Sequence, residues 1–292
     1  MDIQTIETFI AVAKHRSFSQ AAKHLLISQP AVSKRIASLE KHFDTRVLDR
    51  FGNRVALTEA GQIILKYGRK ISFDLHSCRQ EIANLDSSAK GELSIATSHH
   101  IAHHYFAKTL SLYQTQFPET VLNFLFLASE DAFQSVLDGE VEIALTTLSP
   151  TPIHHVRVVK AWDDPMKIVV ASQSNADSQS KTVNSKSIGD KAALLPAKST
   201  FTRQLIDQTL GNRLQGVSVK EVNNLETIKL LVAAGLGWSV LPNMMITKGE
   251  LKVLDERLTV PRQLGIICHE DRSLSNAAKR FVEVFSPGQA AP

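Results

Sequence analysis

The sequence contains FSQAAKHLLISQPAVSKRIASLEKHF, residues 18–43, which has the pattern of two helices joined by a short turn. Ser17 and Gln20 form a Ser-x-x-Gln capping box, which predicts the start of the first helix. Ser28 predicts the start of the second, because Pro30 then falls in the first turn, where its missing N–H does no harm. Helix, short turn and helix is the helix-turn-helix arrangement.

The second predicted helix has two different faces. At about 100° per residue, Val32, Ile36 and Leu39 fall together and should face a core. The opposite face is small and cationic, with Pro30, Lys34, Ala37 and Lys41 flanked by Ser33 and Ser38. Such a face can approach a DNA groove closely, whereas bulky apolar residues there would indicate a protein partner.

The next segment, TRVLDRFGNRVALT at residues 45–58, predicts a β-hairpin. Two short β-prone runs flank a Phe-Gly-Asn turn, with Arg50 and Arg54 beside its tip. Residues 1–58 carry nine Lys and Arg against five Asp and Glu, whereas residues 91–292 carry 19 against 20. The positive charge therefore belongs to the N-terminal segment, as expected for a nucleic-acid-binding domain.

Residues 18–43, followed by DRFGNRVALTEAG at residues 49–61, resemble the LysR-type transcriptional regulators. The resemblance implies a winged helix-turn-helix whose second helix enters the major groove while the wing holds the backbone. It makes Gln29, Pro30, Ser33 and Lys34 the candidates for base contacts, and Arg35, Arg50 and Arg54 the candidates for phosphate contacts. The sequence departs from the family pattern at Asp44, usually glycine, and at Leu48, often phenylalanine.

Residues 59–90 predict a long linker helix. Apolar residues at positions 64, 67, 71, 75, 78, 82 and 85 alternate three and four apart, which is the seam of a coiled coil. A lone helix with one apolar stripe is unstable in water, so we expect a second copy of the chain beside it. A dimer also supplies the geometry for two half-sites on DNA.

Residues 91–292 alternate predicted strands and helices, which indicates an α/β domain with parallel sheets. We expect two lobes, the first from about residues 91–161 with 266–292 and the second from about residues 162–265. Here LVAAGLGWSVLP, residues 231–242, again resembles the LysR-type pattern. The resemblance implies an effector-binding domain similar to the periplasmic binding proteins, with its ligand between the lobes.

Ligands of open α/β sheets bind beyond the carboxyl ends of the strands. This rule selects the hydroxyl-bearing residues Thr97, Ser98, Thr147, Ser199, Thr200 and Thr202. His99 and His100, at the start of the predicted helix after Ser98, are further candidates for effector contact. Hydroxyls and helix N-termini together favour a small anion or carboxylate as the effector. The same hydroxyls could also serve only as helix caps.

Four histidines stand in TSHHIAHHYF, residues 97–106. Helical spacing pairs His99 with His103 on the expected buried side, and His100 with His104 on the outer flank. No single face collects three ligands, so we expect packing or effector contacts and no closed metal site. A metal- or redox-responsive regulator stays open as an alternative, through these histidines or through Cys78 and Cys268.

Other classes of protein fit the sequence less well. A ligand carrier of the periplasm would need a secretion signal and has no use for residues 1–58. An enzyme could use Ser98 and His99, but adjacent residues at a helix start point apart and no orienting carboxylate is evident. We therefore expect a cytoplasmic regulator without a cofactor. Its expected partners are promoter DNA, a small effector, further copies of itself as a dimer or tetramer, and RNA polymerase.

Overall fold

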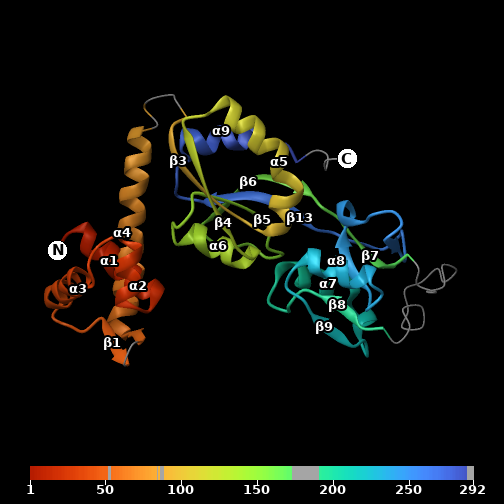
Figure 1. Ribbon diagram of the computed structural model, residues 1–292, viewed down its shortest axis with the longest axis horizontal. Helices are drawn as coiled ribbons and strands as arrows, with labels where there is room; N and C mark the ends of the chain where they lie inside the picture. Colours follow the sequence, from red (N-terminus) through yellow and green to blue (C-terminus); the bar gives the residue numbers. More distant parts are fainter. Residues whose placement is uncertain (52–53, 84, 86–88, 173–190, 288–292) are drawn as a thin grey trace. The chain divides into compact units, whose positions relative to one another are not determined.

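The computed structural model describes residues 1–51, 54–83, 85, 89–172 and 191–287 (Figure 1). The chain divides into two compact units, Met1–Asp86 and Ser87–Pro292. No helix in the described part of the chain combines the length and apolarity needed to cross a bilayer.

The first unit begins with three helices and a hairpin. These are α1 (Ile3–His15), α2 (Phe18–His24), α3 (Gln29–Phe43), β1 (Leu48–Phe51) and β2 (Arg54–Leu57). Each helix starts at a polar residue whose side chain accepts a hydrogen bond from an amide in the first turn: Asp2 for α1, Ser17 for α2 and Ser28 for α3. The two starts predicted at Ser17 and Ser28 are therefore confirmed.

The core of this unit lies under α3. Val32, Ile36 and Leu39 are at most 1% exposed and pack against Phe9 and Val12 of α1. This confirms the predicted core face of α3, and it leaves the opposite face exposed.

The long helix α4 (Glu59–Ala83) follows the hairpin. Its first turn lies very close to the segment before β1, since a Cβ at Gly61 would come within 2.0 Å of the Val47 carbonyl oxygen. Ile64, which we predicted for the coiled-coil seam, packs instead against the core under α3. The apolar residues that stay exposed along α4 include Ile63, Tyr67, Ile71 and Ile82.

The second unit contains two lobes. The first is built on a five-stranded sheet in the order β4-β3-β5-β13-β6. Its strands are β3 (Gly91–Thr97), β4 (Thr120–Phe126), β5 (Ile143–Thr147), β6 (Val156–Asp163) and β13 (Gln263–His269). Helices α5 (His99–Gln116) and α9 (Asn276–Val284) cover one face, and α6 (Ser129–Leu137) covers the other (Figure 1).

The second lobe is arranged around β7 (Met166–Ala171). Strands β10 (Ser239–Pro242), β11 (Leu251–Val253) and β12 (Thr259–Val260) all pair with it antiparallel. Only β8 (Ala193–Leu195) and β9 (Val219–Glu221) form a parallel pair among the described strands of this lobe. Helices α7 (Phe201–Leu210) and α8 (Leu225–Ala233) complete the lobe, with short 3-10 turns at Gly211–Leu214 and Asn243–Met245. The expectation of parallel sheets thus fails for β7 and its partners, and in the first lobe for β13, which pairs antiparallel with β5 and β6.

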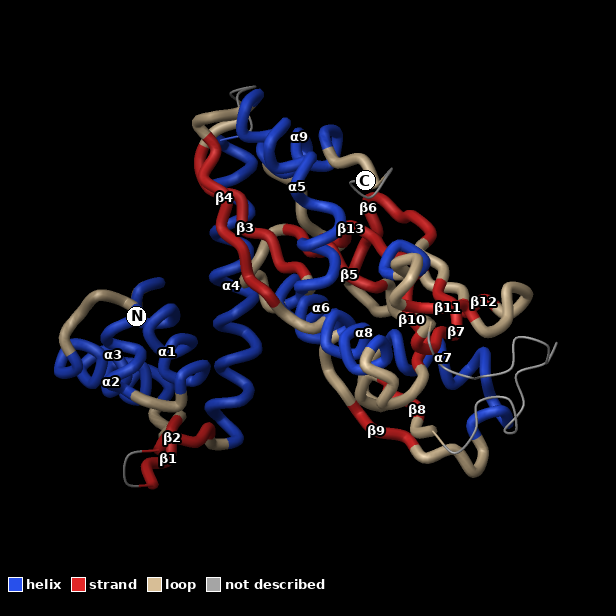
Figure 2. Tube along the Cα trace, turned by 45° about the vertical axis from the view of Figure 1, so that its right-hand side comes forward, coloured by secondary structure: helices blue, strands red, loops and turns tan. Residues whose placement is uncertain are grey.

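The chain crosses between the lobes twice, and the two crossings lie side by side. It leaves the first lobe at Asp164 and returns at Arg262, where the Asp164 amide donates a hydrogen bond of 2.8 Å to the Arg262 carbonyl oxygen. Since β6 ends at Asp163 and β13 begins at Gln263, the crossings lie slightly inside the limits of 162 and 265 that we expected. Figure 2 shows β7 and β13 on either side of this connection.

Candidate functional site

The exposed face of α3 is a candidate surface for DNA. Gln29, Pro30 and Lys34 are exposed, and Ser33 is half-buried. Ser19 at the start of α2 donates a hydrogen bond of 2.9 Å to the Gln29 side chain, which joins the beginnings of the two helices. The polar groups predicted to contact bases therefore lie together at the N-terminal end of α3.

Arg35 lies in a different environment from the other candidates. Its guanidinium donates hydrogen bonds to the Thr8 hydroxyl at 3.1 Å and to the Gln4 side chain at 2.6 Å, which hold α3 against α1. Its predicted phosphate contact stays a prediction. The side chains of Arg50 and Arg54, also predicted for phosphates, lie outside the described residues.

The second unit contains a cavity of about 250 Å³ between its lobes. Four helices begin at its wall. The lining residues are Ser98, His99 and His100 of α5, Leu127 to Glu130 at α6, Thr200 and Thr202 of α7, and Asn223 to Leu225 at α8, with Phe126, Thr147, Pro196 and Arg262.

Three of these helix starts are capped by side chains within the chain. Ser98 accepts from the Ile101 amide at 3.3 Å, Thr200 from the Arg203 amide at 3.2 Å, and Asn224 from the Thr227 amide at 3.0 Å. Among the described residues, α6 has no such side-chain cap. Each N-terminus carries a partial positive charge, so the wall of the cavity favours an anion.

One carboxylate of the protein itself already lies at two of these positively polarised helix N-termini. Glu130 at the start of α6 accepts a hydrogen bond of 2.5 Å from the Phe201 amide at the start of α7. Because α6 belongs to the first lobe and α7 to the second, this bond joins the lobes across the cavity.

Six of the eight residues predicted to contact an effector line the cavity, namely Ser98, His99, His100, Thr147, Thr200 and Thr202. Thr97 is fully buried, with its hydroxyl directed to the Ser98 carbonyl oxygen, and Ser199 is exposed outside the lining. Sequence reasoning missed Ser129, although it follows a strand that ends at the same edge, and Asn224, a recognisable cap residue. No local pattern indicated Arg262.

The predicted orientation of the histidines is wrong. His100 is 6% exposed, whereas His99 and His103 are exposed. The residues that α5 buries are Ile101, Phe106, Thr109 and Tyr113 as well as His100, so the helix is turned relative to the prediction. His99 instead stacks its ring on Phe126, with ring centroids 5.1 Å apart.

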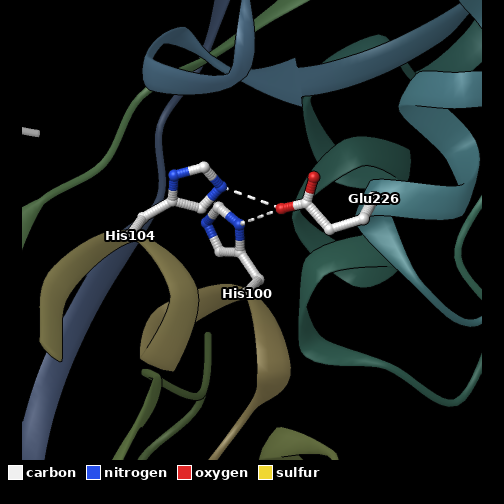
Figure 3. A group of neighbouring side chains, drawn as sticks. All are labelled: His100, His104 and Glu226. Atoms are coloured by element: carbon white, nitrogen blue, oxygen red, sulfur yellow. Dashed lines mark hydrogen bonds and ion pairs between the residues drawn. The ribbon is translucent and has the colours of Figure 1, made fainter. Parts of the chain in front are cut away.

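His100 and His104 are directed to the second lobe (Figure 3). The His104 Nε2 lies 2.8 Å from a carboxylate oxygen of Glu226 in α8, and the His100 Nδ1 lies 3.8 Å from the same oxygen. On its other side, the His100 Nε2 lies 3.2 Å from the Arg262 guanidinium, which also pairs with Asp164. The group thus links α5, α8 and both crossings between the lobes.

The charges within this group follow from its contacts. The His100 ring contributes most to lowering the pKa of Glu226 to about 2, partial burial opposes it, and His104 reinforces it. Burial lowers the pKa of His104, and the contact with Glu226 only partly offsets this. Burial alone would raise the pKa of Asp164, but the contacts with His100 and Arg262 outweigh it and lower that pKa. Near neutral pH, therefore, both acids are carboxylates and His104 is neutral.

Comparison with known proteins identifies the family. A family described as the LysR substrate binding domain matches residues 86–289, and one described as the bacterial regulatory helix-turn-helix protein, lysR family, matches residues 3–62. The chain belongs to the LysR family. This LysR-type protein is thus a DNA-binding transcriptional regulator with an effector-binding domain, and not an enzyme.

Relatives of this LysR-type regulator match over nearly its whole length. A probable RuBisCO transcriptional regulator of Thalassiosira pseudonana is 28% identical and covers 96% of this chain and 95% of its own. The regulator CysL of Bacillus subtilis is also 28% identical, over 85% of this chain and 83% of its own.

Solved structures have the same fold. Full-length OxyR from Pseudomonas aeruginosa has a TM-score of 0.72 at 21% identity and covers 98% of this chain and 93% of its own. CbnR complexed with its target DNA has a TM-score of 0.62 at 20% identity, and it covers 98% of this chain and 99% of its own.

Proposed function

We propose that this regulator reads operator DNA through the N-terminal end of α3. The main support is that Gln29, Pro30 and Lys34 are exposed there, whereas the opposite face of α3 is buried. Side chains of this kind reach base edges in the major groove, and lysine also neutralises phosphates. We infer that the protein acts in the cytoplasm, because its proposed partner is promoter DNA.

Lys34→Ala tests this proposal in gel shifts at several salt concentrations. Loss of one phosphate contact should weaken binding and reduce the salt slope by about 1. Lys248→Ala is a matched control, since Lys248 is an exposed lysine of the second unit. Equal salt slopes for Lys34→Ala and the unchanged protein would remove Lys34 from the contact surface.

We further propose that a small anionic effector binds in the cavity between the lobes. Four helix N-termini and the hydroxyls of Thr147 and Thr202 meet there, beside Arg262, whose charge is paired with Asp164. Backbone amides and hydroxyls of this kind recognise carboxylates and inorganic oxyanions. Binding would stabilise one arrangement of the lobes, which can alter DNA bending and the recruitment of RNA polymerase.

A thermal-shift screen of small carboxylates and inorganic anions against the full chain tests this site. A true effector raises the melting temperature by mass action. The double variant Thr147→Val and Thr202→Val should lose that rise, and neither residue provides the side-chain cap of α5, α7 or α8. Thr115→Val, on the exposed part of α5, is the control. If the double variant responds like the unchanged protein, the effector site is elsewhere.

We infer that α4 joins two copies of the chain, as the apolar residues along it indicate, and that dimers can pair into tetramers.

The alternative of a redox-responsive regulator has less support. Cys268 is fully buried and burial raises the pKa of its thiol, which keeps it protonated and unreactive. Cys78 is exposed on α4.

A further inference from the structure

Two histidines and one glutamate meet at the boundary between the lobes. His100 and His104 stand one turn apart on α5, and Glu226 lies in the first turn of α8, 122 residues further along the chain than His104 (Figure 3). One nitrogen of each ring and a carboxylate oxygen all lie within 4.8 Å of one another. The two histidines are recognisable in the sequence, but the third ligand is not.

These donors suit a transition-metal ion of the zinc type. Imidazole nitrogens and carboxylate oxygens bind zinc at about 2.0–2.2 Å, and two ligands of a tetrahedral site then lie roughly 3.3 Å apart. The Glu226 oxygen is 2.8 Å from the His104 Nε2 and 3.8 Å from the His100 Nδ1, so two of the three separations bracket this value. Small side-chain movements could therefore form three bonds to one ion.

A second observation points independently to a ligand here. The His100 side chain is 7% exposed, and its Nδ1 has no hydrogen-bond partner within the described residues. The Glu226 carboxylate at 3.8 Å is too far away for a hydrogen bond, so it compensates the desolvation of this buried nitrogen only in part. This nitrogen is the one that faces Glu226, whereas the Nε2 of the same ring faces Arg262 and Asp164.

We propose that His100, His104 and Glu226 bind a divalent ion of the zinc class, with water completing the coordination. The ion would bridge the lobes, because two of its ligands come from the first lobe and one from the second. His104 and Glu226 are 17% and 38% exposed at the side chain, so an ion can reach the site from solvent. The proposal does not depend on an anionic effector.

Asp164 has a positioning role in this proposal. The Arg262 guanidinium can only donate, so in the present arrangement the His100 Nε2 accepts and the Nδ1 of a neutral ring carries the proton. Metal binding at Nδ1 would place the ring proton on Nε2, which requires the Arg262 guanidinium to give up its contact with Nε2 while it stays paired with Asp164. The Asp164 oxygen, 3.9 Å from Nε2, is the acceptor that can receive that proton in a hydrogen bond.

The test uses full-length protein without a histidine tag, stripped of metal by a chelator and titrated with zinc in a calorimeter. One ion per chain should bind, and zinc should raise the melting temperature. His104→Ala and Glu226→Gln should each weaken binding by at least about tenfold. Cobalt bound by the unchanged protein should give the visible absorption of a tetrahedral site, and Glu226→Gln should diminish it.

His103→Ala is the matched control, since His103 is exposed on the same helix and outside the group of three. It should bind zinc as the unchanged protein does. Loss of affinity in His103→Ala equal to that in His104→Ala would overturn the proposal, because it would indicate general binding by the histidine-rich segment. Absence of zinc binding in the unchanged protein would also overturn it. Circular dichroism of each variant separates loss of binding from loss of folding.

Discussion

The buried ion pair of Asp164 and Arg262 lies where the two crossings between the lobes run side by side. Its side chains are 4% and 1% exposed, so neither charge has water as an alternative partner. Asp164→Asn should destabilise the second unit by about 3 kcal/mol, because it leaves a buried guanidinium without its counter-charge.

Tryptophan fluorescence during thermal unfolding measures this effect, since Trp162 and Trp238 both belong to the second unit. The exposed neighbour Asp163 provides the control variant Asp163→Asn. An unchanged melting temperature for Asp164→Asn would show that the pair contributes little.

The lowered pKa of Glu226 predicts a pH dependence. A carboxylate whose pKa falls from 4.5 to about 2 on folding stabilises the protein above the higher value, and the contribution disappears as pH falls toward the lower one. In chelator-containing buffer, Glu226→Gln should therefore melt below the unchanged protein near neutral pH. The difference should shrink at acidic pH; a constant difference would contradict the lowered pKa.

Leu26, in the turn between α2 and α3, has a strained backbone. Its φ is 54°, in the left-handed region, and its side chain is 92% exposed, so it gains nothing from packing. Leu26→Asn should stabilise the first unit by about 1 kcal/mol, since asparagine tolerates this conformation. Leu26→Val should do the reverse, because a β-branched residue fits it less well. Calorimetry measures both melting temperatures, and a higher one for Leu26→Val than for Leu26→Asn would contradict the prediction.

Single residues differ in how far sequence predicts them. The unusual Asp44 is explained by the structure, since it caps α3 with a φ of 47°, where glycine is the common choice. Glu226 could not be paired with the histidines beforehand, because only the packing of two distant helices brings them together.

Among the elements, α3 was predictable because its start and faces are local properties. Ser28→Ala removes the side-chain bond to the Ala31 amide and should cost about 1 kcal/mol. DNA affinity should fall as well, because the cap fixes the turn beside Gln29. Ser38→Ala, on an exposed position within the same helix, is the control. Equal stability of both variants would show that the cap is dispensable.

Several strands were not predictable from local pattern. β6 is an edge strand with mostly exposed or half-buried residues, so its apolar signal is weak. β11 and β12 have three and two residues, too few for a period to be recognised. Their antiparallel pairing with β7 could not be read from the alternation of strands and helices, because α7 and α8 lie between β7 and both strands.

At the scale of the whole molecule, the first unit has an apolar groove beside α4, and the proposed dimer would place a second copy of α4 there. It has a volume of about 340 Å³ and is lined mainly by apolar residues, among them Ile6, Leu39, Phe43, Tyr67 and Ile71. Ile71→Glu should weaken the dimer by about 2 kcal/mol, roughly thirtyfold in the dissociation constant. Sedimentation at several concentrations measures this, with the exposed Gln62→Glu as a control of equal charge change. A dimer of unchanged affinity would place the interface elsewhere.

The order of the parts along the chain was the most predictable property, because charge and periodicity change at each boundary. The arrangement of the two lobes could not be predicted, since it depends on contacts between distant residues such as Glu130 and Phe201.

The adjacent crossings at Asp164 and Arg262 make the second lobe an insertion into the first. Both of its ends meet at one point, and the interrupted sheet is completed by β13 after the return. Recombination between related genes can therefore exchange the whole second lobe, because its two junctions with the first lobe are neighbours in space. New specificities could arise in this way while the N-terminal reading helix and the remainder of the protein stay as inherited.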